Sequence, residues 1–212
     1  MYKTLLTVTI TILIIGCEGG ETKSKVENYN SGDQVDTSNG SNMQAQSAIH
    51  QIPEISESQK REFLDAVNSA RADTQDCGNE GVFQPAPPLE WSDELYRSAY
   101  EHSRDMALNG IVEHYGTNTE SDWTAKDLNL GHGSHFYERD EYNGYTNYKL
   151  VSENVAGGTN LDNAYDVVAA WLKSDGHCAN LMNKDIKDIG MALVKENTKY
   201  THYWTQEFGA KH

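Results

Sequence analysis

Two histidines three residues apart form the most local pattern of metal-ligand type in this sequence. His132 and His135 lie in the glycine-rich segment Gly-His-Gly-Ser-His. Two imidazoles at this spacing can chelate a divalent metal ion such as zinc. Glycine and serine are equally typical of an exposed turn. The composition of the segment favours the turn, with the metal pair as the alternative.

Sequence patterns of other well-known chemistries are absent. The chain has no Gly-x-Ser-x-Gly nucleophile elbow and no Walker-type phosphate loop. It therefore supports neither a serine hydrolase of the usual architecture nor a nucleotide-dependent enzyme. The formal charge is −15, from 17 Lys plus Arg and 32 Asp plus Glu. We expect no nucleic-acid partner, because binding a phosphate backbone needs clustered basic side chains.

The first seventeen residues have the pattern of an export signal. Lys3 precedes an apolar run from Leu5 to Gly16, which is shorter than the roughly 20 residues of a membrane-spanning helix. The run, Gly16 and Cys17 resemble the lipobox of bacterial lipoproteins. This resemblance implies a signal peptide over residues 1–16, a lipidated Cys17, and attachment to a membrane of the cell envelope through that lipid. The alternative is an ordinary cleaved signal with a chance cysteine, and both interpretations predict export.

Export leaves two further cysteines in a compartment where disulfides persist. Cys77 and Cys178 are expected to pair, since an even number of cysteines in an exported chain is typical of a disulfide framework. Two buried free thiols are the alternative. If they pair, no thiol nucleophile is left.

The chain divides into a polar leader and a folding part. Residues 17–57 are rich in Ser, Asn, Gly and Gln, and such a segment cannot offset its ordering entropy by burying apolar surface. We expect a flexible tether there and a single domain over 58–212. The capping-box spacing of Ser56 and Gln59 indicates the first helix.

Apolar periodicity and turn residues predict the elements of this domain. We expect helices over 57–73, about 92–109, 123–128 and 161–174, a mainly irregular region over 115–150, and two strands over 186–194 and 200–208 joined by a tight turn. Helices followed by a hairpin favour a layered α+β domain.

Four ordered segments carry a resemblance to a known family. They are His-Ser-Arg-Asp-Met from His102 with His114 beyond it, Ser-Glu-Asn-Val-Ala from Ser152, Trp-Leu-Lys-Ser-Asp-Gly-His-Cys-Ala-Asn from Trp171, and Tyr-Trp-Thr-Gln-Glu-Phe-Gly from Tyr203. In this order and spacing they resemble the CAP superfamily, or SCP domain, in its bacterial form. The resemblance covers about 58–212 and implies an α-β-α sandwich with a small, mainly antiparallel sheet between helices.

The resemblance also implies a surface cleft lined by His and Glu, here His114, Glu153 and His177. Two imidazoles and a carboxylate suit zinc or another divalent metal. His114 and His177 are the implied metal ligands. Without metal, the three groups could act as a hydrogen-bonded acid/base set. Glu153 could alternatively close a strand–loop junction, and Trp171 is expected in the core.

Three positions depart from the family pattern. Ser174 stands where eukaryotic members have a second Glu, and Tyr203 where they have a second His. Asp175 stands where many relatives have proline. A carboxylate there is expected to raise the pKa of His177. His202 is expected to point away from the cleft by strand alternation.

Three functions remain open. The sequence favours an envelope-anchored, non-enzymatic CAP protein that binds a protein or small ligand in the His/Glu cleft, because binding is usually placed on loops of a rigid scaffold. The second is a metal-assisted peptide or ester hydrolase, with His114 and His177 as ligands or bases and Glu153 as general base. The third is sterol or fatty-acid binding, which the resemblance permits.

Overall fold

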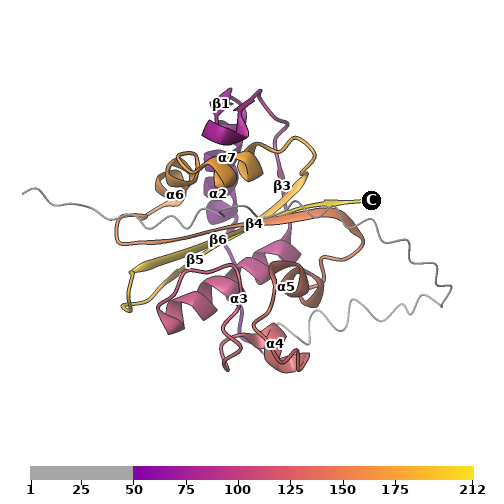
Figure 1. The fold of residues 1–212 in the computed structure, drawn as a ribbon, viewed down its shortest axis with the longest axis vertical. Coiled ribbons are helices and arrows are strands. Elements are labelled where there is room, and N and C mark those ends of the chain that lie inside the picture. Colours follow the sequence, from indigo (N-terminus) through magenta and orange to yellow (C-terminus); the bar gives the residue numbers. More distant parts are fainter. Residues whose placement is uncertain (1–49) are drawn as a thin grey trace, which may run out of the picture.

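The computed structural model describes residues 50–212 as one three-layered domain (Figure 1). The expected signal peptide, Cys17 and most of the expected tether lie outside the described residues. Within them, residues 50–56 contact the domain: His50 stacks on Trp123 with ring centroids 4.5 Å apart, and Ile52 and Ile55 pack against apolar clusters. Among the helices of residues 50–212, none has the length and apolarity of a membrane span.

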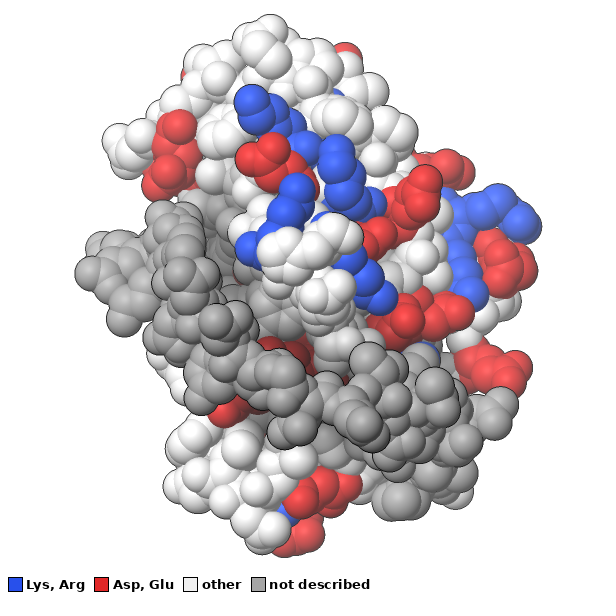
Figure 2. All heavy atoms as spheres, turned by 90° about the vertical axis from the view of Figure 1, so that its right-hand side faces the viewer, with Lys and Arg blue, Asp and Glu red and all other residues white. Residues whose placement is uncertain are grey.

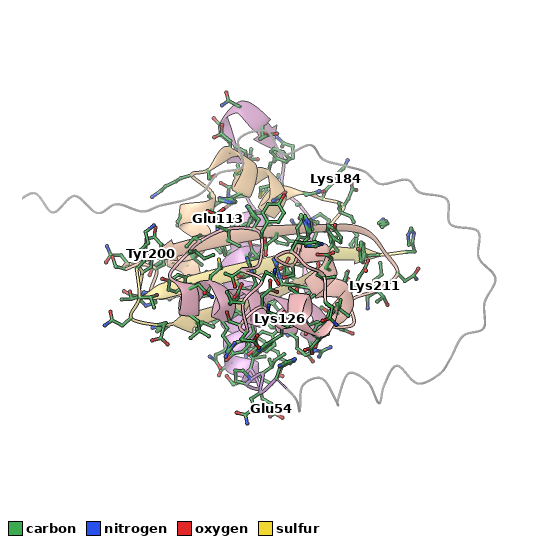
Figure 3. All side chains as sticks on the ribbon, turned by 60° about the horizontal axis from the view of Figure 1, so that its bottom comes forward. Glu54, Glu113, Lys126, Lys184, Tyr200 and Lys211 are labelled. Carbon is green, nitrogen blue, oxygen red and sulfur yellow. A yellow bond between two sulfur atoms is a disulfide. The ribbon has the colours of Figure 1, made fainter. Side chains whose placement is uncertain are left out.

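A four-stranded sheet forms the middle layer, in the order β3-β5-β6-β4. Its strands are β3 (Glu90–Trp91), β5 (Asp188–Lys195), β6 (His202–Lys211) and β4 (Tyr148–Gly158). Among these described strands, β3 and β5 pair in parallel and the other neighbours pair antiparallel. The expected small, mainly antiparallel sheet is therefore confirmed. Tyr200, two residues before β6, and Lys211, its last residue, lie at opposite sides of the view in Figure 3.

Helices cover both faces of this sheet. In Figure 1, α2 (Glu57–Arg71), α6 (Ala164–Trp171) and α7 (Asp175–Met182) lie above it, and α3 (Asp93–Asn109), α4 (Trp123–Asp127) and α5 (Phe136–Tyr142) lie below. A short hairpin, β1 (Gln75–Asp76) and β2 (Val82–Phe83), with the 3-10 turn η1 (Gly78–Glu80), extends the upper side. The α-β-α sandwich is confirmed.

The main apolar core lies between the sheet and the upper helices. Trp171 and Trp204 are its largest members, with 0% and 1% of their surface exposed. Trp171 also donates from Nε1 to the Val155 carbonyl at 3.1 Å. Its expected core position is confirmed. Smaller clusters, around Met106 and Ala99, lie between the sheet and α3.

Capping residues begin two of the predicted helices. Ser56 and Gln59 form a capping box at α2, and Ser92 caps α3. Gly110 ends α3 with φ of 64°, a left-handed conformation that glycine adopts without steric cost.

Three expectations about elements were wrong. The third helix spans Ala164–Trp171, and a separate helix, α7, follows Ser174. The region 115–150 contains α5 and the start of β4. The β5–β6 connection spans residues 196–201, closed by a bond from the Glu196 amide to the Thr201 carbonyl at 3.3 Å, so it is longer than a tight turn.

Charged side chains intermix on the face that Figure 2 presents. Lys and Arg side chains in the upper part of that view lie next to Asp and Glu side chains. The visible part of this face therefore has no continuous basic surface.

Candidate functional site

Glu153 is the centre of the candidate site. It lies on β4, one of the two outer strands of the sheet, and is 4% exposed. Its carboxylate contacts Arg139 Nη2 at 2.6 Å, His114 Nδ1 at 2.7 Å and His102 Nε2 at 3.6 Å. Burial by itself would raise the pKa of Glu153, but His102, Arg139 and His114 outweigh it and hold that pKa well below its usual range. Glu153 is therefore a buried anion and a weak base.

Arg139 fixes both this carboxylate and the histidine beside it. The guanidinium is 1% exposed and belongs to α5. Besides Glu153, it donates to the Ser134 carbonyl at 2.7 Å and to the His114 carbonyl at 3.1 Å. A rigid fork of donors of this kind holds several acceptors at once. Arg139 thus positions both the backbone of His114 and the carboxylate of Glu153.

His102 is a buried support on α3. It is fully buried, and its Nε2–H donates to the Glu113 carbonyl at 2.8 Å. Burial, reinforced by Arg139, lowers the pKa of His102 to about 4. The neutral ring therefore holds the segment that leads into His114.

His114 and His177 approach each other from opposite layers. His114 follows α3 below the sheet, and His177 lies on α7 above it. Their ring centroids are 6.5 Å apart. His177 is 2% exposed, and neither of its ring nitrogens has a hydrogen-bond partner among the described protein atoms. Burial, with a smaller effect of His114, lowers the pKa of His177 to about 4, so the ring is neutral at pH 7.

The expected effect of Asp175 on His177 is wrong. The Asp175 carboxylate turns to Asn79 and accepts from its backbone amide at 3.0 Å and its side-chain amide at 2.8 Å. The pKa of His177 falls rather than rises, because burial dominates. Asp175 instead ties the start of α7 to η1.

A disulfide and two asparagines anchor α7 at the site. Cys77 and Cys178 form the predicted bridge, with Cα atoms 5.4 Å apart. Asn154 donates to the His177 carbonyl at 3.2 Å, and Asn180 donates to the Glu153 carbonyl at 3.2 Å. His177 is thereby held next to the β4 position that carries Glu153.

The positions that depart from the family pattern have structural roles. Ser174 precedes α7 as its N-cap residue. Tyr203 is fully buried in the cluster around Met106, and its hydroxyl lies 2.6 Å from Thr198 Oγ1. His202 contacts Asp162 at 3.2 Å, away from the site, as strand alternation predicts.

Sequence reasoning did not assign His102, Arg139 or Glu207 to the site. Glu207 is the register partner of Glu153 on β6 and is fully buried. Burial, with a further contribution from Glu153, raises the pKa of Glu207 well above its usual value. The sequence did offer one signal for Glu207: it is the one charged residue in the segment from Tyr203 to Ala210. An acid in such a segment is expected to have a specific role, because acids are rarely buried without a partner.

The three residues implied by the resemblance do not form a ready metal site. Two imidazoles on one tetrahedral zinc have ring centroids about 5.2 Å apart, from Zn–N bonds of about 2.0–2.1 Å. The 6.5 Å separation of the His114 and His177 rings exceeds this. Glu153 is already engaged by Arg139 and His114. The donor types suit zinc, but the rings would have to approach each other, and Glu153 would orient His114 rather than bind the ion.

A different cluster of three residues in the described part of the chain has side-chain atoms close enough to share one metal ion. Potential ligand atoms of His132, His135 and Glu138 all lie within 4.8 Å of one another. Two hollows in the described surface, of about 440 and 430 Å³, are lined by neither this group nor the His114–His177 pair.

Comparisons with known proteins agree with the fold. The family model described as "CAP: Cysteine-rich secretory protein family" matches residues 64–208. An uncharacterized protein of Bacillus subtilis, YkwD, is 28% identical over 60% of this chain and 42% of its own length. A Bacillus anthracis extracellular protein containing an SCP domain superposes with a TM-score of 0.52 and 19% identity, over 76% of this chain and 45% of that one.

A further solved structure, an outer surface protein of Borrelia burgdorferi, superposes with a TM-score of 0.50 and 23% identity, over 72% of this chain and 96% of that one. The matches to the two Bacillus proteins span less than half of their lengths. Because the family model covers well over half of the sequence, the chain belongs to the CAP family of cysteine-rich secretory proteins.

Proposed function

We propose that this protein is an exported, non-enzymatic CAP domain, attached to the bacterial cell envelope by lipid on Cys17, that binds a peptide or small polar ligand between His114 and His177. The observation that carries the proposal is His177, a neutral, buried ring whose two nitrogens have no partner among the described protein atoms. An unsatisfied buried polar group costs about 1–3 kcal/mol. A ligand that hydrogen-bonds this ring would recover that free energy.

The surroundings support hydrogen bonding by the ligand. Because Nδ1 of His114 is engaged by Glu153 at 2.7 Å, its ring orientation is set before a ligand arrives. Arg139 holds the same carboxylate and the His114 carbonyl. Such preorganisation lowers the entropy that binding would otherwise cost.

Export and anchoring are supported by the sequence pattern and by the relatives. The apolar run before Cys17 resembles a lipobox. Two structures of the same fold are described as an extracellular and an outer surface protein. Labelled palmitate should be incorporated into the full chain in bacteria and should be lost in Cys17→Ser. Equal labelling of that variant, or no labelling of the wild type, would contradict the anchor.

No observation in residues 50–212 specifically favours either of the two alternative functions, a hydrolase or a lipid-binding protein. The hydrolase hypothesis used Glu153 as general base, but its low pKa and its ion pairs make it a weak base. No described residue set favours a sterol or fatty acid over a polar ligand.

Ring-nitrogen NMR of the full chain tests the ligand site. The protein is labelled with ¹⁵N-histidine and titrated with a panel of tripeptides. We expect at least one peptide to shift the ring signals of His114 and His177 together. The variant His177→Phe keeps an aromatic ring but has no nitrogen, so it should abolish the shift at His114. If no peptide perturbs either ring, or if shifts persist in His177→Phe, ligand binding at this pair is refuted.

A further inference from the structure

We propose that His132, His135 and Glu138 form a binding site for a divalent transition-metal ion of the zinc type, separate from the His114–His177 pair. Two of the residues belong to the loop before α5, and Glu138 lies in the first turn of that helix. Their potential ligand atoms lie within 4.8 Å of one another. Two imidazoles and one carboxylate are a known ligand set for zinc with an open fourth position.

The spacing needs only a small closure. Ligand atoms around a tetrahedral zinc lie about 3.3 Å apart, given bonds of about 2.0–2.1 Å. The largest separation in this cluster is below 4.8 Å, so side-chain rotation has to close at most about 1.5 Å. His132 is exposed, and His135 and Glu138 are partly exposed. Because none of the three is fully buried, the ion can reach them from solvent, and the exposed His132 has room to move towards the other two.

A backbone contact of His132 leaves one ring nitrogen for a metal ion. Its Nδ1 lies 2.9 Å from the Gly133 carbonyl oxygen. Because a carbonyl can only accept, Nδ1 is the donor in this contact, and Nε2 is the nitrogen that remains for a ligand bond. Histidines that bind metals usually donate their second ring nitrogen to a carbonyl or carboxylate in this way.

The other two ligands are also oriented. The His135 ring stacks on Tyr137 with centroids 5.2 Å apart and meets the edge of Tyr115 at 4.8 Å. Glu138 Oε2 accepts from the His135 backbone amide at 2.8 Å. The His132 and His135 rings are 5.5 Å apart, close to the value of about 5.2 Å for two imidazoles on one tetrahedral ion.

The loop that carries the two histidines is firmly held, not a loose turn. Between them, Ser134 is fully buried and donates to Asp122 through both its amide, at 3.0 Å, and its hydroxyl, at 2.7 Å. The Gly116 amide donates to the Ser134 carbonyl at 2.8 Å. At Gly133, an added Cβ would meet the Gly116 carbonyl. The packed Ser134 therefore fixes the spacing of the histidines on either side of it.

Isothermal calorimetry of the full chain with Zn²⁺ tests the site. Three variants each remove one ligand: His132→Gln, Glu138→Gln, and His135→Phe, which keeps the aromatic stacking. Loss of an outer-sphere partner typically weakens metal binding about 10–100-fold, so loss of a direct ligand should weaken zinc binding at least about tenfold. The matched control is His177→Gln, which should leave the dissociation constant within about twofold of wild type.

The outcomes separate this site from the ligand site proposed above. Zinc binding that is lost in His177→Gln but kept in the loop variants would place the ion at the other pair and overturn the proposal. The absence of zinc binding by the wild-type chain, or binding that no loop variant weakens, would also overturn it.

A second readout guards against misfolding of a variant. Tetrahedral Co²⁺ absorbs visible light strongly, so wild-type protein titrated with Co²⁺ should show this band and the exposed-site variant His132→Gln should not. The metal-free melting temperature of His132→Gln should match that of the wild type. An equal Co²⁺ band in this variant contradicts the assignment of His132 as a ligand.

Discussion

Replacing His177 by glutamine should change how the stability of this protein depends on pH. Burial lowers the pKa of His177 to about 4 in the folded state, whereas an unfolded histidine has a pKa of about 6.5. Between these values the unfolded chain binds the proton and the folded chain does not. The folded state therefore loses stability as pH falls from about 6.5 towards 4. Above about pH 6.5 the ring is neutral in both states, and none of this stability is lost.

The magnitude follows from the two pKa values. At pH 5.5, protonation of the unfolded ring lowers the free energy of unfolding by about 1.4 kcal/mol relative to pH 8, from the difference between about 6.5 and about 4. His177→Gln has no ring to protonate, so this loss should be absent. Asp140, whose pKa burial raises to about 8, contributes in the opposite direction but is common to both proteins. The difference between wild type and variant isolates His177.

Urea unfolding at pH 8 and pH 5.5, with the disulfide intact, measures this difference. Wild type should lose about 1.4 kcal/mol more than His177→Gln between the two pH values. His212→Gln, at the exposed C-terminus, is the control for removing a histidine. If wild type and His177→Gln change equally within about 0.3 kcal/mol, the reasoning from burial is refuted.

Three further variants test the packing of the site and of the sheet that carries it. Arg139→Leu leaves the buried Glu153 carboxylate without its guanidinium and should cost about 3–5 kcal/mol in urea unfolding; a loss below about 1 kcal/mol would show that the pair is not desolvated. Replacing Cys77 and Cys178 by serine opens a loop of sequence separation 101 and should cost about 4–5 kcal/mol by the chain-entropy model, seen as a lower melting temperature. Gly190→Ala places a Cβ against the backbone of α3 and should cost about 1–3 kcal/mol or more, whereas an unchanged melting temperature would mean that α3 can shift.

Elements with strong end signals could be predicted from the sequence. The capping-box spacing of Ser56 and Gln59 marked a helix start that the structure confirms. The end of the third helix was harder to predict. Apolar periodicity continues to Leu172 and placed the end at Ser174, but the helix ends at Trp171. The amides of Lys173 and Ser174 then bond to carbonyls three residues back, which tightens the turn and starts α7.

The strand that carries Glu153 was hidden for a different reason. β4 places Glu153 on one face of the sheet and Asn154 on the other, and both are buried. A strand with polar residues on both faces lacks the alternation by which half-buried strands are recognised. The same polar residues are what the site requires: Glu153 holds His114, and Asn154 holds the backbone of His177. The feature that concealed the strand is therefore a consequence of its role in the site.

Arg139 illustrates why the remaining partners could not be found from the sequence. It lies in a region whose Tyr, Gly, Asn and His residues, without sustained periodicity, favoured a loop, yet α5 forms there and buries it. A buried guanidinium is stable only with acceptors around it, and these come from positions 114, 134 and 153, on three separate segments. Because no local pattern links these positions, only the folded chain brings them together. The same short helix carries Glu138 on its first turn, so one element supports both the His114–His177 pair and the proposed metal ligands.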